Sequence, residues 1–322
     1  MADDTDRKLK TRAPEPPAAR REPLPWQEPK SAEEDPDAPA RVRALLESPT
    51  YRQADRDVDF LNLDATRGVR LEIDYLKAEL GLEGRGVEHT IVVFGSTRLR
   101  EPAAARRRLE ALRAELAKSP RDAELARRVR VAERLLDKAH YYDVARELGK
   151  LVGDCGAGGD CRVLLMTGGG PGIMEAANRG AFDAGAPSAG LNISLPHEQF
   201  PNPYVTPELC FSFHYFAMRK LHFLLRARAL VAFPGGYGTL DEVFETLTLV
   251  QSRTIEPVPV VLVGESYWRR VVDIDFLVDE GMIDVEDREL FWYAESAEEI
   301  WSTILAWNER NGTPLVVPPC GP

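Results

Sequence analysis

Short apolar runs alternate with longer helix-like segments along most of the chain. A continuous β-branched run bounded by turn residues is typical of a strand buried on both faces. The predicted strands are Thr90–Phe94, Arg162–Thr167, Ala189–Leu195, Cys210–Phe213, Ala229–Phe233 and Val258–Val263. The first predicted helix follows Thr167 and runs to Gly185. The other predicted helices are Phe216–Arg228, Thr239–Gln251, Tyr267–Glu280 and Ala297–Glu309. This order predicts an α/β fold, a Rossmann-like, doubly wound and mostly parallel sheet with helices on both faces.

Changes in composition divide the chain into segments. Residues 1–40 hold eight of the 24 prolines among charges of both signs, which predicts a disordered tail. Residues 41–88 read as a helical lead-in, residues 89–311 as the Rossmann-like domain and residues 312–322 as a C-terminal tail. Within the domain, residues 101–150 predict an arginine-rich helical hairpin. Pro120 divides it into two helices, and the second helix runs through Leu148.

Composition excludes several classes of protein. The 322 residues are 44% hydrophobic, enough for a packed core, yet they contain neither an apolar stretch of membrane-spanning length nor a signal peptide. We therefore expect a cytoplasmic protein without a membrane partner. The four cysteines lack CxxC spacing, so we expect free thiols and neither a zinc site nor a disulfide framework.

Charge bears on nucleic-acid binding. The formal net charge is −11, although between Arg98 and Arg130 eleven basic residues face five acidic ones. That stretch has no interleaved aromatic residues, and a solvated helix face with ion pairs between successive turns explains it better than a polynucleotide surface. We therefore expect no nucleic-acid polymer as a partner.

Two glycine-rich loops each follow a predicted strand and precede a predicted helix. In such a loop, backbone N–H groups and the positive end of the helix dipole converge on an anion. The sequence therefore predicts a ligand that carries phosphate. The candidate phosphate-binding residues are Gly168, Gly169, Gly170 and Gly172 in the first loop and Gly235, Gly236, Gly238 and Thr239 in the second.

Four groups of candidate residues fall at the carboxyl ends of the predicted strands. Ser96 and Arg98 follow the first strand, the two glycine loops follow two others, and Arg219 lies early in the helix after Cys210–Phe213. Ligands of open parallel sheets bind at this edge. Each residue alone has a structural explanation, since a carboxylate such as Glu242 also favours the first turn of a helix through the dipole. Their agreement in position is what favours a site.

Other chemistries find little support. The five histidines lack metal-ligand spacing, and no GxSxG elbow is present, so we expect neither a metal site nor acyl-transfer chemistry. We also expect no cofactor. Lys220 and Glu245 complete the set of candidate binding residues, although Lys220 is better placed to face a carboxylate than a substrate.

One motif resembles a known family. The run from Pro234 to Glu242, PGGYGTLDE, is similar to the PGGxGTxxE motif of the Lonely Guy (LOG) phosphoribohydrolases, which are often mislabelled as lysine decarboxylases. Arg219 and Lys220 resemble that family's RK pair. The resemblance runs from about Thr90 to Trp307. It implies hydrolysis of the N-glycosidic bond of a nucleoside 5′-monophosphate, AMP-like or cytokinin-like, to a free base and ribose 5-phosphate, usually by a homodimer.

The chain differs from the short plant-like members of the family in two motifs. Their GGGxxGxMG element reads GGGPGIME here, from Gly168 to Glu175, and Phe216 stands where their MxxRK element has its methionine. The first form is similar to the larger bacterial LOG-like proteins and to bacterial nucleotide 5′-monophosphate nucleosidases. A homodimer would place apolar residues such as Phe216, Phe223 and Phe244 partly against the partner.

The resemblance assigns roles to two residues. Hydrolysis of a ribosyl–base bond passes through an oxocarbenium-like state, which a fixed carboxylate stabilises while it orients or deprotonates water. Glu242 is the candidate for that carboxylate, and Arg219 would clamp phosphate or polarise the departing base.

Three alternatives remain open at this point. The first is a non-enzymatic nucleotide-binding or molybdenum-cofactor carrier protein of the same fold. The second is a pyridoxal-phosphate decarboxylase, for which Lys220 is the only lysine beyond Lys150. The third is an NAD enzyme, which the absence of a GxGxxG loop disfavours.

Overall fold

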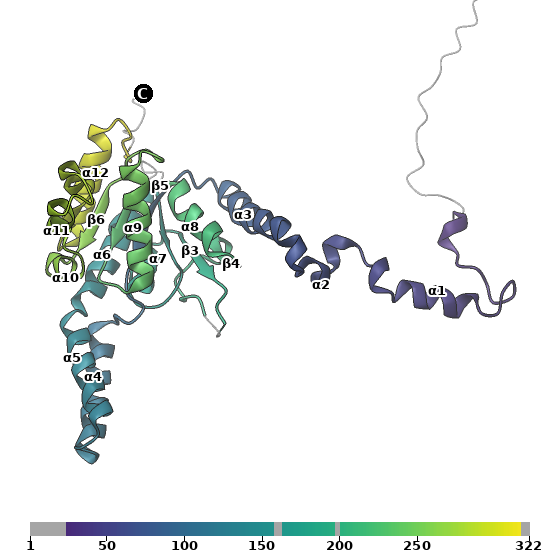
Figure 1. Ribbon diagram of the computed structural model, residues 1–322, viewed down its shortest axis with the longest axis horizontal. Coiled ribbons are helices and arrows are strands. Elements are labelled where there is room, and N and C mark those ends of the chain that lie inside the picture. The colour runs from purple at the N-terminus through teal and green to yellow at the C-terminus, as the bar shows by residue number, and fades with distance from the viewer. Residues whose placement is uncertain (1–23, 158–162, 197–199, 317–322) are drawn as a thin grey trace, which may run out of the picture. The chain divides into compact units, whose positions relative to one another are not determined.

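The computed structural model describes residues 24–157, 163–196 and 200–316 (Figure 1). The chain divides into two compact units, Met1–Arg67 and Gly68–Pro322. Most of the tail predicted over residues 1–40, and the end of the one predicted over 312–322, lie outside the described residues. None of the helices in the described residues is both long and apolar enough to cross a membrane.

The described part of the first unit contains short helical elements. Asp57 caps one of them by accepting a hydrogen bond from the N–H of Phe60 at 3.2 Å. The helices are α1 (Ala38–Leu46) and α2 (Val58–Leu61), and the single 3-10 turns are Pro25–Gln27, Pro49–Tyr51, Ala54–Arg56 and Asp64–Thr66.

The second unit is built on a sheet of seven strands in which every neighbouring pair is parallel. The strand order is β4-β3-β2-β1-β5-β6-β7. The strands are β1 (His89–Phe94), β2 (Val163–Thr167), β3 (Ser188–Ile193), β4 (Cys210–Phe213), β5 (Ala227–Ala232), β6 (Val260–Val263) and β7 (Trp292–Ala294). The predicted α/β class with a doubly wound parallel sheet is confirmed. Strand β7, only three residues long at the sheet edge, was not predicted.

The helices of this unit differ from the prediction at three breaks. The second helix of the predicted hairpin is two helices, because the chain turns at Lys138 and Ala139. The predicted helix Tyr267–Glu280 is also two helices, separated by Asp273, which caps the second one. The helix after β4 ends at Leu225, so β5 starts earlier than expected. The helices are α3 (Arg67–Glu83), α4 (Pro102–Lys118), α5 (Ala123–Asp137), α6 (His140–Ala157), α7 (Ile173–Asp183), α8 (Phe216–Leu225), α9 (Tyr237–Gln251), α10 (Glu265–Val271), α11 (Ile274–Asp279) and α12 (Ala297–Arg310), with 3-10 turns at Pro207–Leu209 and Val285–Leu290.

The helices cover both faces of the sheet, and the alternation of side chains along each strand shows it. Ile91 and Val93 of β1 pack in a core with α6, α7 and α12, whereas Val92 and Phe94 pack in a second core with α3, α8, α9 and α10. Phe223 belongs to that second core. It is fully buried and packs edge-on against Phe94, so the expectation that it faces a partner is wrong.

The α4–α5 hairpin has a small core of its own. Leu109 and Leu112 of α4 pack against Leu125, Val129 and Ala132 of α5. In Figure 1 the hairpin extends away from the sheet. The two helices therefore have an apolar core of their own, and Leu135 of α5 also packs against the main core.

One expectation about the cysteines also fails. Cys155 is disulfide-bonded, whereas Cys210 is a free thiol. The spacing of cysteines alone gave no sign of a disulfide bond.

Candidate functional site

The sheet reverses its direction of winding between β1 and β5. Strands β2, β3 and β4 lie on one side of β1, and strands β5, β6 and β7 lie on the other. Chains that leave neighbouring strands in opposite directions open a crevice at the carboxyl edge, where ligands of such folds bind. The loops there are joined by backbone hydrogen bonds: the Ser96 N–H donates to Pro234 O (3.0 Å) and the Ile173 N–H donates to Ser96 O (3.1 Å).

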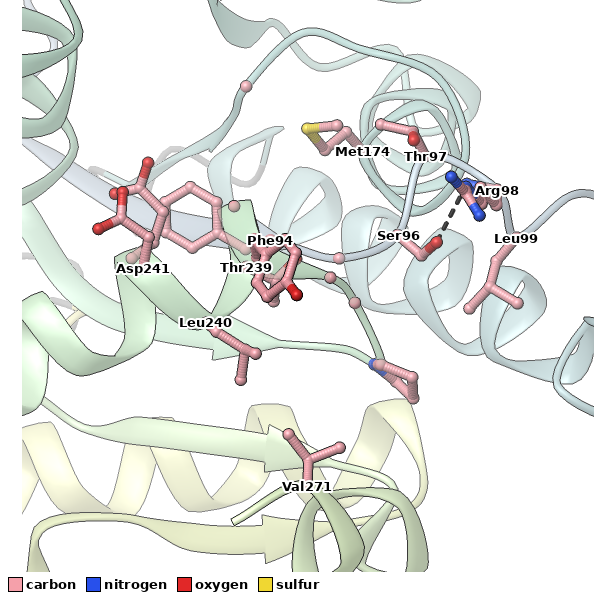
Figure 2. A pocket seen from close by; sticks show the side chains of 18 of the residues that line it. Phe94, Ser96, Thr97, Arg98, Leu99, Met174, Thr239, Leu240, Asp241 and Val271 are labelled. Carbon is pink, nitrogen blue, oxygen red and sulfur yellow. Dashed lines mark hydrogen bonds between the residues drawn. The ribbon is translucent and has the colours of Figure 1, made fainter.

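A cavity of about 930 Å³ occupies this crevice. Figure 2 shows a close view, with Ser96, Thr97 and Arg98 on one side and Asp241 on the other. Nine of the sequence-predicted site residues line the cavity: Ser96, Arg98, Gly168, Arg219, Gly235, Gly236, Gly238, Thr239 and Glu242. Residues from three strand-to-helix loops and from α8 and α9 therefore converge on one space.

The second glycine loop forms the N-terminus of α9. Gly236 is the N-cap, so the first backbone N–H groups of α9 have no acceptor within the helix. A Cβ atom at Gly236 or Gly238 would meet nothing within 4 Å, whereas one at Gly235 would collide with the hydroxyl of Thr239. Gly235 is thus required by packing, and Gly236 and Gly238 leave the backbone open to an anion.

Glu242 is the buried carboxylate of the cavity. It is the sixth residue of α9, in the second turn and not the first turn that the sequence predicted, and only 7% of it is exposed. Burial raises the pKa of Glu242 to about 7, although Arg219 and Lys220 act in the opposite direction. A carboxyl group with this pKa exchanges protons near neutral pH.

Arg219 approaches the cavity from α8. Its Nε donates to the carbonyl of Leu191 at 2.7 Å, and its guanidinium lies 5.1 Å from the ring centroid of Phe223. Burial lowers the pKa of Arg219, and the charge of Glu242 partly offsets that effect. Within the described part of the chain neither Arg219 nor Glu242 forms an ion pair, so both charges remain available to a ligand.

Lys220 is held by two carboxylates. Its ammonium group pairs with Asp241 at 3.0 Å and with Glu245 at 3.1 Å. Burial lowers the pKa of Lys220, but the hydrogen bonds to the two carboxylates outweigh this effect and the net shift is upward. Neither Lys220 nor Glu245 lines the cavity, although the sequence grouped both with the binding residues.

The first glycine loop reaches the cavity through Gly168 alone. A Cβ atom at Gly168 would lie 2.5 Å from Nη2 of Arg219, so the absence of a side chain there leaves room for the guanidinium. Gly169, Gly170 and Gly172 are buried behind it and do not line the cavity. The N–H of Gly169 already donates to the hydroxyl of Thr167 at 2.9 Å.

A buried amide network that the sequence did not reveal holds this loop. Asn202 donates hydrogen bonds to two carbonyl groups of the loop. Its backbone N–H donates to Gly169 O (2.8 Å), and its side-chain amide donates to Gly170 O (3.1 Å). The same amide donates to Asn178, which also accepts from Thr167. Asn178 and Asn202 belong to no motif, so the sequence did not indicate that they hold the loop.

Three further residues contribute to the site without having been predicted there. Arg134 of α5 and Lys138, which directly follows α5, line the cavity, and Tyr267 of α10 donates its hydroxyl proton to the carbonyl of Gly235. Among the described residues no group of three or more His, Cys, Asp or Glu is arranged to hold a metal ion. The sequence analysis predicted that the basic hairpin is a solvated surface. In the structure, the C-terminal end of α5 and the turn that follows it line the cavity.

Comparison with known proteins agrees with this architecture. A family model described as "Possible lysine decarboxylase" matches residues 174–304. The rice (Oryza sativa subsp. japonica) protein "Cytokinin riboside 5′-monophosphate phosphoribohydrolase LOG" is 31% identical over 166 residues, a match that covers 51% of this chain and 65% of the rice protein. The Arabidopsis thaliana protein of the same description, LOG1, is 32% identical over 170 residues, covering 51% of this chain and 75% of that protein.

Among solved structures, the molybdenum cofactor carrier protein from Chlamydomonas reinhardtii is 20% identical, with a TM-score of 0.40 over 68% of this chain and 99% of the carrier. We infer nothing about function from a likeness at that level. The sequence matches to the plant proteins carry the assignment. At 32% identity over 75% of the Arabidopsis protein, the chain belongs to the LOG family of lysine decarboxylase-like proteins.

Proposed function

We propose that this protein hydrolyses the N-glycosidic bond of a nucleoside 5′-monophosphate. The observation that carries the proposal is the position of Glu242, a buried carboxyl with a pKa of about 7, in the same cavity as the open N-terminus of α9. The relatives named above are described as phosphoribohydrolases of a riboside 5′-monophosphate. An AMP-like or cytokinin-like nucleotide is therefore the substrate class.

The N-terminus of α9 would hold the 5′-phosphate. The backbone at Gly236 and Gly238 is unobstructed, and the helix dipole favours a dianion at this point. Two exposed aromatic side chains of the cavity lining, Phe216 and Tyr237, offer flat faces on which the base would stack. The phosphate and the base together would place the ribose beside Glu242.

The reaction then needs few groups. As the bond from C1′ to the base nitrogen breaks, positive charge develops on the ribose ring, and the ionised carboxylate of Glu242 stabilises it. Water adds to C1′, and its proton passes to Glu242, giving ribose 5-phosphate. Arg219 would bind phosphate or draw electrons from the departing base, which takes up one proton from the solvent while Glu242 returns the proton of the water to the solvent.

The position of Lys220 argues against decarboxylase chemistry. A lysine that forms a Schiff base with pyridoxal phosphate must reach the cofactor as a free amine. Lys220 instead lies outside the cavity lining, and its two carboxylate partners favour the ammonium form. An absorbance scan of the purified protein is expected to show no internal aldimine.

The test is release of free base from a panel of nucleoside 5′-monophosphates, followed by chromatography. Glu242→Gln should reduce turnover by about 100-fold or more, because it keeps the size of the side chain and removes its charge and basicity. Nucleotide binding should persist in this variant. The control is Glu309→Gln, an exposed glutamate of α12.

Two results would contradict the proposal. If the wild type binds nucleotides and releases base from none of them, the protein is a carrier or a sensor. If Glu242→Gln retains full turnover, the catalytic carboxylate lies elsewhere.

The family resemblance also leads us to propose a homodimer as the functional form.

A further inference from the structure

The end of the α4–α5 hairpin adds positive charge to the cavity. Arg134 of α5 and Lys138 directly after it line the cavity together with Arg98 from the loop after β1. These three cations are additional to Arg219. The acidic side chains of the lining are Asp241 and Glu242, and Asp241 is already paired with Lys220.

The packing of the hairpin explains why these side chains face the cavity. Leu125, Val129 and Ala132 of α5 are buried against α4. Val131, Arg134 and Leu135, three or four residues apart, form a different stripe of the same helix, and this stripe lines the cavity together with Lys138, the C-cap of α5. The positions of Arg134 and Lys138 therefore follow from the packing of α5 in the hairpin core and, through Leu135, against the main core.

The three cations have no carboxylate partner among the described residues. Two other arginines of the hairpin do have such partners, since Arg113 pairs with Glu133 at 2.7 Å and Arg127 pairs with Glu124 at 2.6 Å. Arg98 lies across the cavity from Asp241 in Figure 2. Unpaired cations that share one cavity raise the local concentration of anions and favour a ligand with matching negative charge.

A nucleoside 5′-monophosphate whose phosphate lies at α9 would leave Arg98, Arg134 and Lys138 without an anionic partner. Its single phosphate would be held at the N-terminus of α9, and its ribose and base are uncharged. A volume of about 930 Å³ is also at the large end of what a small-ligand site needs. We infer that Arg98, Arg134 and Lys138 form a second anion subsite, and that the preferred ligand is a nucleotide with a second phosphate group.

This inference rests on the proposed nucleotide site, and it concerns binding rather than turnover. The second phosphate could extend the first as a diphosphate or occupy another ribose hydroxyl. Equilibrium binding of AMP, ADP and adenosine 3′,5′-bisphosphate distinguishes these cases. The measurement is made by calorimetry on the full-length Glu242→Gln protein, so that no ligand is consumed.

At least one of the two doubly phosphorylated nucleotides should bind about tenfold more tightly than AMP, since one charge-assisted contact accounts for a factor of this size. Adding Arg134→Ala and Lys138→Ala should remove that preference while the affinity for AMP changes little. The preference should also shrink as ionic strength rises. Arg128→Ala is the matched control, because Arg128 is an exposed arginine of α5 that does not line the cavity.

Three outcomes would overturn the subsite. AMP and both doubly phosphorylated nucleotides could bind equally, the preference could survive the double substitution, or the substitution could weaken AMP to the same extent. The last result would mean that α5 holds the single 5′-phosphate. Base release by the wild type is scored separately, so a preference without hydrolysis refutes only the proposed reaction. A protein that binds no nucleotide of the panel refutes both proposals.

Discussion

The pKa of Glu242 gives the proposed reaction a characteristic pH dependence. Burial is the main cause of the upward shift to about 7, so the carboxyl is protonated over much of the mildly acidic range. Only the ionised form stabilises an oxocarbenium and accepts a proton. We expect kcat/KM to rise with pH and to level off above neutrality.

Below the pKa of Glu242, kcat/KM should rise about tenfold per pH unit. The measurement is a pH–rate profile with one nucleoside monophosphate. The substrate phosphate also titrates, with a second pKa near about 6. The residual activity of Glu242→Gln provides the control. Its kcat/KM should still change with pH where the substrate phosphate titrates, and it should no longer change near pH 7. A profile that is flat between pH 6 and about 8 would be inconsistent with Glu242 as the base.

The same shift predicts that Glu242 destabilises the fold at neutral and alkaline pH. A carboxyl whose pKa is raised from 4.5 to about 7 holds its proton more tightly in the folded state, so stability falls as pH rises through this window. The penalty is at most about 3 kcal/mol at high pH. Glu242→Gln should therefore melt several degrees above the wild type at alkaline pH, by calorimetry.

Below the unfolded pKa of 4.5 the two proteins should converge, because Glu242 is then protonated in both the folded and the unfolded state. A lower melting temperature for Glu242→Gln at alkaline pH would show that the carboxylate is stabilised by its surroundings. Gain of stability with loss of turnover is the pattern expected of a residue placed for function.

At the scale of elements, one glycine at the start of α9, Gly235, is needed for packing, and two others, Gly236 and Gly238, leave the backbone open to the ligand. Gly235→Ala should lower the melting temperature, because the new Cβ collides with Thr239 and disturbs the carbonyl held by Tyr267. Gly238→Ala should leave the melting temperature unchanged or raise it, since alanine favours a helix by up to about 1 kcal/mol.

Both substitutions should weaken nucleotide binding, but only Gly235→Ala through loss of structure. Thermal melting combined with calorimetric binding tests this in one pair of proteins. If Gly238→Ala binds nucleotides as tightly as the wild type, the N-terminus of α9 is not where the phosphate lies.

Strands were easier to predict than the ends and breaks of helices. Long β-branched runs such as Thr90–Phe94 are buried on both faces, so their composition alone identified β1 and its neighbours. The break between α5 and α6 leaves no such trace, because Lys138 and Ala139 are compatible with a helix. The chain turns there because α5 packs in the hairpin core and α6 packs on the sheet.

The site shows the same contrast. Glycine loops and a carboxylate in a motif could be placed at the sheet edge from topology alone. The entry of Arg134 into the cavity depends on the direction of the hairpin, and the role of Asn202 depends on a contact across 32 residues of sequence. Both are tertiary properties to which local patterns are blind.

The pairing of α3 with α8 carries a stability prediction. Arg226, which directly follows α8, makes two hydrogen bonds to Glu79 of α3, at 2.9 and 2.7 Å, and the carboxylate of Asp74 accepts from the N–H groups of His214 and Tyr215. The hydrogen bonds from Arg226 are the largest cause of the lowered pKa of Glu79. We expect Glu79→Gln to destabilise the fold by roughly 1–3 kcal/mol in chemical denaturation.

Because the pKa of Glu79 is lowered, its contribution is present above the unfolded value of 4.5 and is lost as pH falls through the folded value. The gap between wild type and Glu79→Gln should therefore close in acid. Glu265→Gln is the control, since its pair with Arg269 is solvent-exposed and is expected to contribute less than about 1 kcal/mol. Equal effects of the two substitutions would refute the anchoring role of α3.

At the scale of the whole molecule, the outer surface of α8 and α9 bears on association. Leu221 and Leu225 lie one turn apart on α8 and are 42% and 47% exposed. A second cavity, of about 1070 Å³, lies along this surface and is lined by Leu221, Leu224, Leu225 and Leu249 among others. Apolar side chains gathered on one surface favour a protein partner.

We expect that partner to be a second copy of the chain, in line with the homodimer that the family resemblance implies. Light scattering at micromolar concentration should give twice the chain mass of 35.9 kDa. Leu221→Glu with Leu225→Glu should give the monomer, because association would bury two charges without partners. Phe276→Glu, at a 57% exposed position of α11, is the matched control and should remain dimeric. A wild type of monomer mass would refute the dimer. A dimer that survives both glutamates would move the interface away from α8, the helix that also presents Arg219 to the cavity.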